Sequence, residues 1–273
     1  MRDDGGFIRV EGLTVSYDGE HLALGGIDMS VGEGDFVAVL GPSGCGKSTL
    51  LQVLSGLVRP VSGRTTIAGT DVTNESVSNR PRVGYVFQDH RLLPWRTVGQ
   101  NLELVLASAG LPKDEWGARV ERFLDMLQIA QHRDAWPMRL SGGQRQRVSI
   151  ARALAIDPAV ILMDEPFSTL DEVTGRRMRQ QLVELWQQQQ RAIVFVTHSI
   201  REAVYLADRI VILTRGPATV LETLEVGIPR PRQYEDPRLA ELESEIVARV
   251  MEVWGYEDGG AATPESDSPM ELA

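Results

Sequence analysis

The strongest constraint on this chain is a glycine-rich segment that lies between an apolar run and a helical pattern. Residues 41–48 read Gly-Pro-Ser-Gly-Cys-Gly-Lys-Ser and fit the pattern G-x-x-x-x-G-K-[ST]. Residues 35–40 form a short apolar run typical of a buried parallel strand, and residues 47–57 have the pattern of a helix. A glycine-rich turn that matched by chance would lack this setting. We therefore predict a loop that binds the phosphates of a nucleotide.

The chemistry of phosphate binding explains the residues of this loop. Its glycines allow consecutive N–H groups to point at a phosphate, and the following helix adds partial positive charge. We expect Lys47 to reach the β- and γ-phosphates and Ser48 to offer its hydroxyl to Mg²⁺. Because Cys45 lies inside the loop, we expect a maleimide to react with it and block the nucleotide. The predicted nucleotide-binding residues are Gly41, Pro42, Ser43, Gly44, Cys45, Gly46, Lys47, Ser48 and Thr49.

Strand and helix patterns alternate along most of the chain. Apolar residues alternate between positions 8 and 17, which predicts a half-buried strand. Further strands are predicted at residues 65–68, 82–87, 160–163, 193–196 and 210–213, and helices at residues 98–109, 115–128, 142–155, 174–189 and 200–207. Alternating strands and helices indicate an α/β fold with a largely parallel sheet. The helical middle of the chain is interpreted as an insertion into that sheet.

Composition narrows the class of protein further. The 273 residues are 42% hydrophobic, which permits one large α/β domain with a substantial core. A formal net charge of −10 argues against a nucleic-acid partner or a polybasic membrane anchor. The single cysteine precludes a disulfide within the chain and fits a reducing compartment. The acidic first six residues do not resemble a signal peptide, and no segment approaches the roughly 20 apolar residues of a spanning helix.

Two acids follow a predicted buried strand. Asp164 comes directly after residues 160–163, and at a strand end its carboxylate can hold Mg²⁺ through water. Glu165 is one residue further, so its side chain is expected to point elsewhere, toward the γ-phosphate. An isolated Asp-Glu pair would normally be a solvated loop. Its position behind a buried strand, in a chain that also carries a phosphate loop, favours a catalytic interpretation.

The segment at residues 140–147 reads Leu-Ser-Gly-Gly-Gln-Arg-Gln-Arg and resembles the signature motif of ATP-binding-cassette (ABC) transporter ATPases. The resemblance covers about residues 7–225 in motif order and spacing. It implies a P-loop NTPase with a RecA-like core, an antiparallel β subdomain and a helical subdomain inserted at about residues 89–157. It also implies a head-to-tail dimer, in which the signature contacts the γ-phosphate of ATP held by the second copy. The signature residues are Ser141, Gly142, Gly143 and Gln144.

The resemblance implies roles for further residues. Glu165 corresponds to the general base or orienter of the attacking water, and Gln88 to the glutamine that senses Mg²⁺ and the γ-phosphate. His198 corresponds to the switch histidine, and Asp171 belongs to the D-loop that crosses the dimer interface. Tyr17 lies where the family places an aromatic residue that stacks on adenine; an edge-strand tyrosine without that role is the alternative. Two departures concern coupling rather than hydrolysis: Ser199 replaces the usual aspartate, and Thr169 the usual alanine.

Residues 86–95 indicate a branch of the family. Their Leu-Leu-Pro-Trp sequence resembles that of nitrate, sulfonate and taurine importer ATPases. If Leu92, Leu93 and Trp95 are exposed, they form an apolar docking surface for a permease. The alternative is that they pack inside the helical subdomain.

The end of the chain is expected to form an extension at residues 226–256 and a disordered acidic tail at residues 257–273. A Pro- and Arg-rich link at residues 229–232 comes first. One face of the predicted helix that follows carries Leu239, Leu242, Ile246 and Val250.

These observations predict an ATPase that converts ATP and water to ADP and phosphate, with Mg²⁺ as cofactor. Its expected partners are a second copy of itself, permease subunits and, indirectly, a solute-binding protein, at the cytoplasmic face of the membrane. An exporter or lipid-transport ATPase is the main alternative. A non-transport ABC ATPase is disfavoured by the single cassette and the absence of a heptad run, and a regulator without turnover by the presence of Glu165 and His198. The ATPase does not touch the solute, so the solute's identity is not encoded here.

Overall fold

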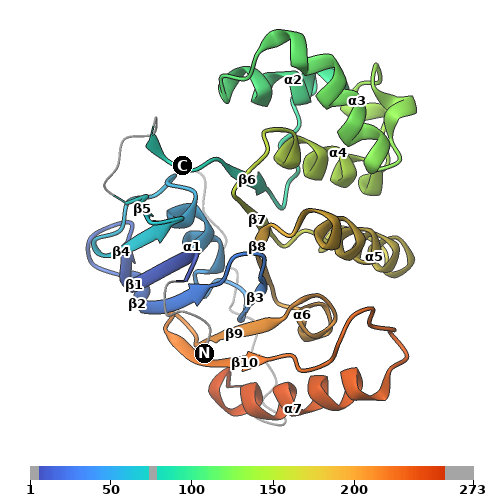
Figure 1. The fold of residues 1–273 in the computed structure, drawn as a ribbon. Helices are drawn as coiled ribbons and strands as arrows, with labels where there is room; N and C mark the ends of the chain where they lie inside the picture. The colour runs from blue at the N-terminus through green and yellow to red at the C-terminus, as the bar shows by residue number, and fades with distance from the viewer. Residues whose placement is uncertain (1–5, 74–78, 256–273) are drawn as a thin grey trace, which may run out of the picture.

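The computed structural model describes residues 6–73 and 79–255, so the predicted tail at residues 257–273 lies outside the described residues. Two sheets and their helices form the molecule (Figure 1). The first sheet is antiparallel, with the order β2-β1-β4-β5. Its strands are β1 (Ile8–Ser16), β2 (Leu22–Val31), β4 (Ser62–Ile67) and β5 (Thr70–Asp71).

The second sheet has the order β10-β9-β3-β8-β7-β6. Its strands are β3 (Phe36–Leu40), β6 (Val83–Val86), β7 (Val160–Asp164), β8 (Ala192–Thr197), β9 (Arg209–Leu213) and β10 (Val220–Glu225). All neighbours are parallel except β10 and β9. Every residue of β3, β7 and β8 is buried, as expected for parallel strands covered on both faces. The predicted α/β fold is therefore confirmed.

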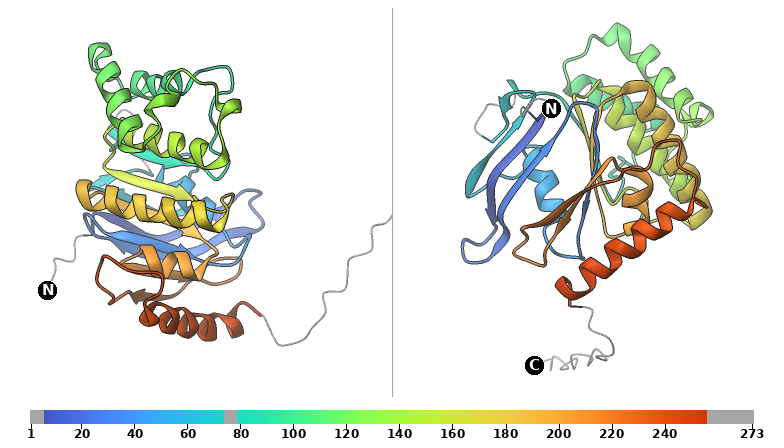
Figure 2. Two further views of the ribbon diagram at one scale, coloured as in Figure 1. Left: turned by 90° about the vertical axis from the view of Figure 1, so that its right-hand side faces the viewer. Right: turned by 60° about the horizontal axis from the view of Figure 1, so that its bottom comes forward.

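The helices divide into groups around this sheet. They are α1 (Lys47–Leu54), α2 (Val98–Ser108), α3 (Trp116–Met126), α4 (Gly142–Ala155), α5 (Glu172–Gln189), α6 (Ile200–Leu206) and α7 (Pro237–Val253). Helix α1 contacts both sheets, and one hydrophobic cluster fills the space between them. Helices α4 to α7 contribute to a second cluster on the other face. Figure 2 shows α2, α3 and α4 at one end of the molecule and α7 at the opposite end.

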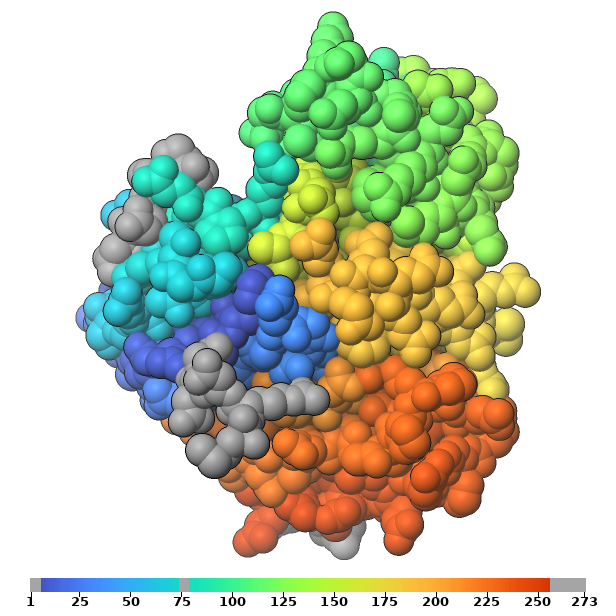
Figure 3. All heavy atoms as spheres, viewed as in Figure 1, coloured from blue at the N-terminus to red at the C-terminus, as the bar shows by residue number. Residues whose placement is uncertain are grey.

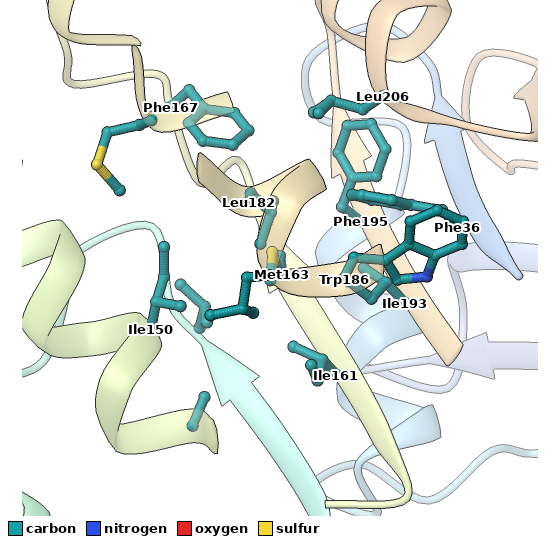
Figure 4. Packing of buried hydrophobic residues seen from close by; sticks show 14 of the residues in the cluster. Phe36, Ile150, Ile161, Met163, Phe167, Leu182, Trp186, Ile193, Phe195 and Leu206 are labelled. Carbon is teal, nitrogen blue, oxygen red and sulfur yellow. The ribbon is translucent and has the colours of Figure 1, made fainter. Parts of the chain in front are cut away.

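The second cluster anchors β3, the strand that leads into the phosphate loop. Phe36 is fully buried and packs edge-on against Phe195 at 5.5 Å and against Trp186 at 5.8 Å between ring centroids (Figure 4). The indole of Trp186 donates to the carbonyl oxygen of Gly34 at 3.1 Å. Burial of one such ring stabilises the fold by about 1.5–3 kcal/mol. The base of the loop is therefore held by aromatic packing.

Helices α2, α3 and α4 lie between β6 and β7 in the chain, as the sequence predicted for the helical middle. They project from the body of the molecule, and a notch separates them from the cyan strands in Figure 3. Helix α2 begins at a capping box formed by Thr97 and Gln100, and α4 at one formed by Ser141 and Gln144. Among the described residues, no helix is both long and apolar enough to cross a bilayer.

Candidate active site

The predicted functional residues gather at the carboxyl ends of four neighbouring parallel strands. The phosphate loop follows β3, Asp164 ends β7, His198 follows β8, and Gln88 lies two residues beyond β6. In open α/β sheets, ligands bind at this edge because the loops that follow adjacent strands meet there. The sheet order β3-β8-β7-β6 therefore brings together residues that are more than 100 positions apart in the sequence.

The lysine of the phosphate loop is held by its own loop. The ammonium of Lys47 donates to the carbonyl oxygens of Gly41 at 2.8 Å and Pro42 at 2.9 Å. Only 5% of Lys47 is exposed to solvent. Because a buried ammonium is costly without partners, these bonds keep the cation at the mouth of the loop. A phosphate that enters the loop meets a positive charge already in position.

Ser48 and Asp164 supply two oxygens suited to Mg²⁺. The hydroxyl of Ser48 donates to Oδ1 of Asp164 at 2.9 Å. Burial raises the pKa of Asp164, and the Ser48 hydrogen bond partly opposes that shift. The described residues contain no group of three acidic, histidine or cysteine side chains that would form a self-contained metal site. Mg²⁺ commonly takes one or two protein oxygens and completes its shell with phosphates and water, so this pair fits the predicted ion.

Glu165 is the centre of the site. Its Oε2 accepts a hydrogen bond from Nε2 of Gln88 at 3.3 Å, and its Oε1 lies 3.1 Å from Nδ1 of His198. The ammonium of Lys47 is 4.0 Å from the same Oε1. The backbone of Glu165 has a φ of 42°, and its N–H donates to the carbonyl oxygen of Val196 at 3.1 Å. The three other residues predicted to be catalytic, Gln88, His198 and Lys47, therefore surround the carboxylate of Glu165.

Tyr17 lies beside the start of α1, one residue beyond β1. Its hydroxyl is 3.0 Å from Oγ1 of Thr49 and donates to Oε1 of Gln52 at 3.1 Å. Although the hydroxyl is bonded, 65% of the residue is exposed. The ring is therefore fixed at one end and open to solvent, which is compatible with stacking on a base.

Cys45 differs from the expectation for a reactive thiol. It is 2% exposed and belongs to the hydrophobic cluster between the two sheets. Burial raises the pKa of the Cys45 thiol, against the opposing charge of Lys47. The side chain faces the core, so only the main chain of Cys45 is available to a phosphate. The motif could not predict that the Cys45 side chain faces the core, because it specifies the spacing of residues and not the direction of their side chains.

The structure adds two side chains that the sequence did not single out. Burial and the charge of nearby Asp164 raise the pKa of Tyr85 on β6. The guanidinium of Arg152 on α4 donates at 2.7 Å to the carbonyl oxygens of both His90 and Arg91. These two residues have φ values of 35° and 46°, which non-glycine residues adopt at a cost. Arg152 thus holds the strained segment that follows Gln88.

The signature residues lie away from this carboxylate. Ser141 caps α4: its hydroxyl accepts from the N–H of Gln144 at 3.3 Å, and the Gln144 amide is 2.9 Å from Nε2 of His132. Gly142 and Gly143 form the first turn of α4. No hydrogen bond or ion pair found in the described ranges joins Ser141 or Gln144 to residues 41–48.

The D-loop lies next to the signature. Asp171 caps α5 by accepting from the N–H of Thr174 at 3.0 Å. Hydrogen bonds from the backbone and the side chain of Thr174 lower the pKa of Asp171. A Cβ atom at Gly143 would lie 2.8 Å from Cγ2 of Thr174. Away from this contact, a hollow of about 320 Å³ lies between the starts of α4 and α5. The chain therefore presents the signature and the D-loop as one surface.

Ser199 shows what replaces the aspartate usual after the switch histidine. Its hydroxyl accepts from the N–H of Glu202 at 3.3 Å, so Ser199 caps α6. An aspartate would accept the same bond. The departure therefore retains the local cap and removes a negative charge.

Comparison with known proteins agrees with this geometry. A family model described as ABC transporter matches residues 24–168. The chain is 37% identical over 247 residues to the nitrate import ATP-binding protein NrtD of Synechococcus elongatus, covering 88% of this chain and 89% of that protein. It is 40% identical over 243 residues to the aliphatic sulfonates import ATP-binding protein SsuB 1 of Streptomyces avermitilis, covering 89% and 86% respectively.

A solved structure extends the likeness. It is a dimeric, post-hydrolysis state of the ATP-binding cassette MJ0796 bound to ADP and Pi, and it superimposes with a TM-score of 0.72 at 32% identity. The match covers 81% of this chain and 100% of that one. Sequence, fold and site geometry agree, and the chain belongs to the ABC transporter family as an ATP-binding domain.

Proposed function

We propose that this chain is the ATP-hydrolysing subunit of an ABC importer. The observation that carries the proposal is the convergence of Gln88, His198 and Lys47 on the carboxylate of Glu165. A carboxylate held by neutral and cationic donors at the edge of a phosphate loop is suited to orient water against a γ-phosphate. Each of the four side chains then contributes to one reaction.

In the proposed mechanism, Glu165 accepts a hydrogen bond from the attacking water and receives its proton. The water oxygen bonds to the γ-phosphorus as the bond to the bridging oxygen breaks and ADP leaves with that oxygen. Gln88 and His198 keep the carboxylate aligned, since both lie within hydrogen-bond distance of it. Lys47 exchanges its loop carbonyls for phosphate oxygens and offsets their negative charge. Ser48 and Asp164 hold Mg²⁺, which when bound neutralises charge on the phosphates.

We propose that the functional unit is a head-to-tail dimer in which each site uses two chains. The support is the exposed position of Ser141 at the start of α4, together with the dimeric form of the similar cassette MJ0796. Within one chain, Ser141 contacts Gln144 and not the phosphate loop. A second copy would supply the missing half of the site.

Mixing two defective variants tests this arrangement. Lys47→Ala removes the phosphate-binding cation, and Ser141→Arg places bulk and charge at the signature. We expect each variant alone to hydrolyse ATP at less than about a tenth of the wild-type rate, because each damages both sites of its own dimer. A mixture contains dimers with one intact site, formed by the phosphate loop of the Ser141→Arg chain and the signature of the Lys47→Ala chain.

ATPase activity recovered on mixing, at constant total protein, supports the shared site. A mixture that stays as inactive as its components contradicts it. The matched control mixes Lys47→Ala with Glu165→Gln. Both substitutions damage the same half of the site, so no dimer of these two chains has an intact site, and no recovery is expected.

An import role is supported by the relatives named for nitrate and aliphatic sulfonates import. The proposed permease contact is the surface around Trp95, which is 68% exposed. Leu92 and Leu93 are only partly exposed, and Leu92 packs against the core, so Trp95 makes up most of the exposed apolar surface of these three residues. Such contacts would place the chain at the cytoplasmic face of a membrane, and the permease would link it indirectly to a solute-binding protein.

A further inference from the structure

A buried arginine in the middle of α5 joins three separate parts of the chain. Arg179 is 5% exposed, and its guanidinium forms three side-chain hydrogen bonds. Nε donates to the hydroxyl of Tyr234 at 2.6 Å, one terminal nitrogen to Glu202 at 2.9 Å, and the other to Glu172 at 3.3 Å. Removing one partner of a buried, paired charge is costly in free energy, so this arrangement is strongly determined.

The bond to Glu202 leads to the switch histidine. The second carboxylate oxygen of Glu202 accepts from the hydroxyl of Thr197 at 2.8 Å. That same hydroxyl accepts from the N–H of Ser199 at 3.0 Å, and the N–H of Glu202 donates to Ser199. Thr197 and Ser199 are the two neighbours of His198. The loop that aims His198 at Glu165 is therefore fastened on both sides of the histidine.

The bond to Glu172 leads to the D-loop. Glu172 is the first residue of α5, directly after the cap Asp171. Arg179 thus connects the helix start that carries Asp171 with the loop that carries His198. The ring of Phe167, two residues after Glu165, lies 5.7 Å from the guanidinium.

The bond to Tyr234 brings in the C-terminal segment. Tyr234 stacks on Tyr205 of α6, with ring centroids 3.9 Å apart, and the guanidinium of Arg176 lies 4.3 Å from its ring. Just before it, Arg232 donates to backbone carbonyls of α6 and its ends, among them Val204 at 2.9 Å and Ala207 at 2.7 Å. The segment between β10 and α7 is therefore fastened to the core where it meets Arg179.

Gly175 shows that α5 makes room for this guanidinium. A Cβ atom at Gly175 would lie 3.2 Å from a terminal nitrogen of Arg179. Glycine inside a helix costs about 0.5–1 kcal/mol relative to alanine. Its place one turn before Arg179 is consistent with a helix arranged around that side chain.

We propose that Arg179 and Tyr234 are positioning residues for ATP hydrolysis, which hold the His198 loop and the start of α5 in a fixed relation to Glu165. The C-terminal segment then contributes to the rate of hydrolysis without touching the nucleotide. This inference rests on the proposed function, since it assigns these residues to that same site. Neither residue belongs to the ATPase motifs identified in the sequence.

Tyr234→Phe is the most direct test, because it removes only the hydroxyl and keeps the ring that stacks on Tyr205. We expect kcat for ATP hydrolysis by the full chain to fall about fivefold, the effect of one lost hydrogen bond. KM for ATP and the affinity for a labelled ATP analogue should stay within about twofold of wild type. A role in packing alone would lower the melting temperature and leave kcat unchanged.

The second test asks whether the effect passes through Glu202. In a Glu202→Gln background, Tyr234→Phe should change kcat by less than it does in the wild type, since both act on the same network. Arg179→Lys keeps the charge but not the three-way geometry, and should lower kcat further. The control is Arg249→Met, which removes an arginine from an exposed ion pair with Glu222 and Glu245 on the same C-terminal part and should leave kcat unchanged.

If the wild-type chain hydrolyses ATP, an unchanged kcat for Tyr234→Phe overturns the inference, and so does a change confined to KM. Strictly additive effects of Tyr234→Phe and Glu202→Gln on kcat also overturn it. The failure of the proposed function looks different, because the wild-type chain would then not hydrolyse ATP at all.

Discussion

The strand-end side and the helical side of this molecule differ in how far their side chains are engaged within the chain. At the strand ends, Lys47, Gln88 and His198 all lie next to the carboxylate of Glu165. On the helical side, Ser141 caps its own helix, and the side chains of Trp95 and Met138 are 68% and 80% exposed. The first side is organised within the chain. On the second side, Trp95 and Met138 are left exposed to solvent.

From this difference we infer that the strand-end side carries out ATP hydrolysis and that the helical side takes part in assembly with other subunits. Substitutions at the strand ends should change how fast ATP is hydrolysed by any assembly that contains the chain. Substitutions on the helical side should change which assemblies form and leave the binding of ATP to a single chain intact. The following predictions test this division, beginning with the largest effect.

Glu165→Gln should lower the rate of ATP hydrolysis by about 10²–10⁴-fold, because it removes a general base. ATP binding should persist, since Lys47, Ser48 and Asp164 are unchanged. With ATP and Mg²⁺, the variant should elute as a dimer from a size-exclusion column. Glu121→Gln, on the exposed face of α3, is the matched control. A Glu165→Gln chain that stays monomeric and hydrolyses ATP normally would contradict the role of this carboxylate.

Trp95→Ala should weaken assembly with the permease by about 2–4 kcal/mol, the range of an interface hot spot. ATP binding and the melting temperature should stay near wild type, because Trp95 is already exposed. Co-purification with the permease measures the first effect, and a nucleotide-binding assay the second. Leu57→Ala, which truncates another apolar residue that is 62% exposed, is the control. Joint loss of stability and ATP binding would show that Trp95 packs inside the protein.

The smallest expected effect concerns the rate at which the Cys45 thiol reacts with a maleimide, which tests the strand-end side alone. Burial raises the pKa of this thiol, so less thiolate is present at a given pH than for a free cysteine. We expect a maleimide to react at least about tenfold more slowly with the native chain than with the urea-unfolded chain. The reaction should accelerate as the pH rises, and saturating ATP should slow it further. Equal rates for the native and unfolded chains would show that the thiol is open to solvent.

The features that were predicted best from the sequence are those that depend on residues close together in the chain. Helix α4 occupies residues 142–155 as predicted, because Ser141 and Gln144 form its cap and its apolar period is regular. The phosphate loop and Asp164 were recognised because spacing and an adjacent buried strand are both visible in the sequence. The interpretation of Gln88 and His198 required the family resemblance, since a single glutamine or histidine has no pattern of its own.

Other features depend on contacts that the sequence does not display. Strand β2 was missed because Gly25 and Gly26 interrupt its apolar pattern, and β10 because it is an edge strand with a half-exposed, acidic sequence. Arg179 and Tyr234 are 55 residues apart, and only the folded chain brings them within hydrogen-bond distance. The direction of the Cys45 side chain likewise follows from the packing beneath the loop.

The close approach of Gly143 to Thr174 has a consequence for the partner that meets this surface. There is no space for even a methyl group at Gly143 beside Thr174, so the starts of α4 and α5 are already in close contact at this point. A partner therefore meets a preformed template rather than two segments that must be ordered on arrival. Little conformational entropy remains to be lost at that step, which favours tight association.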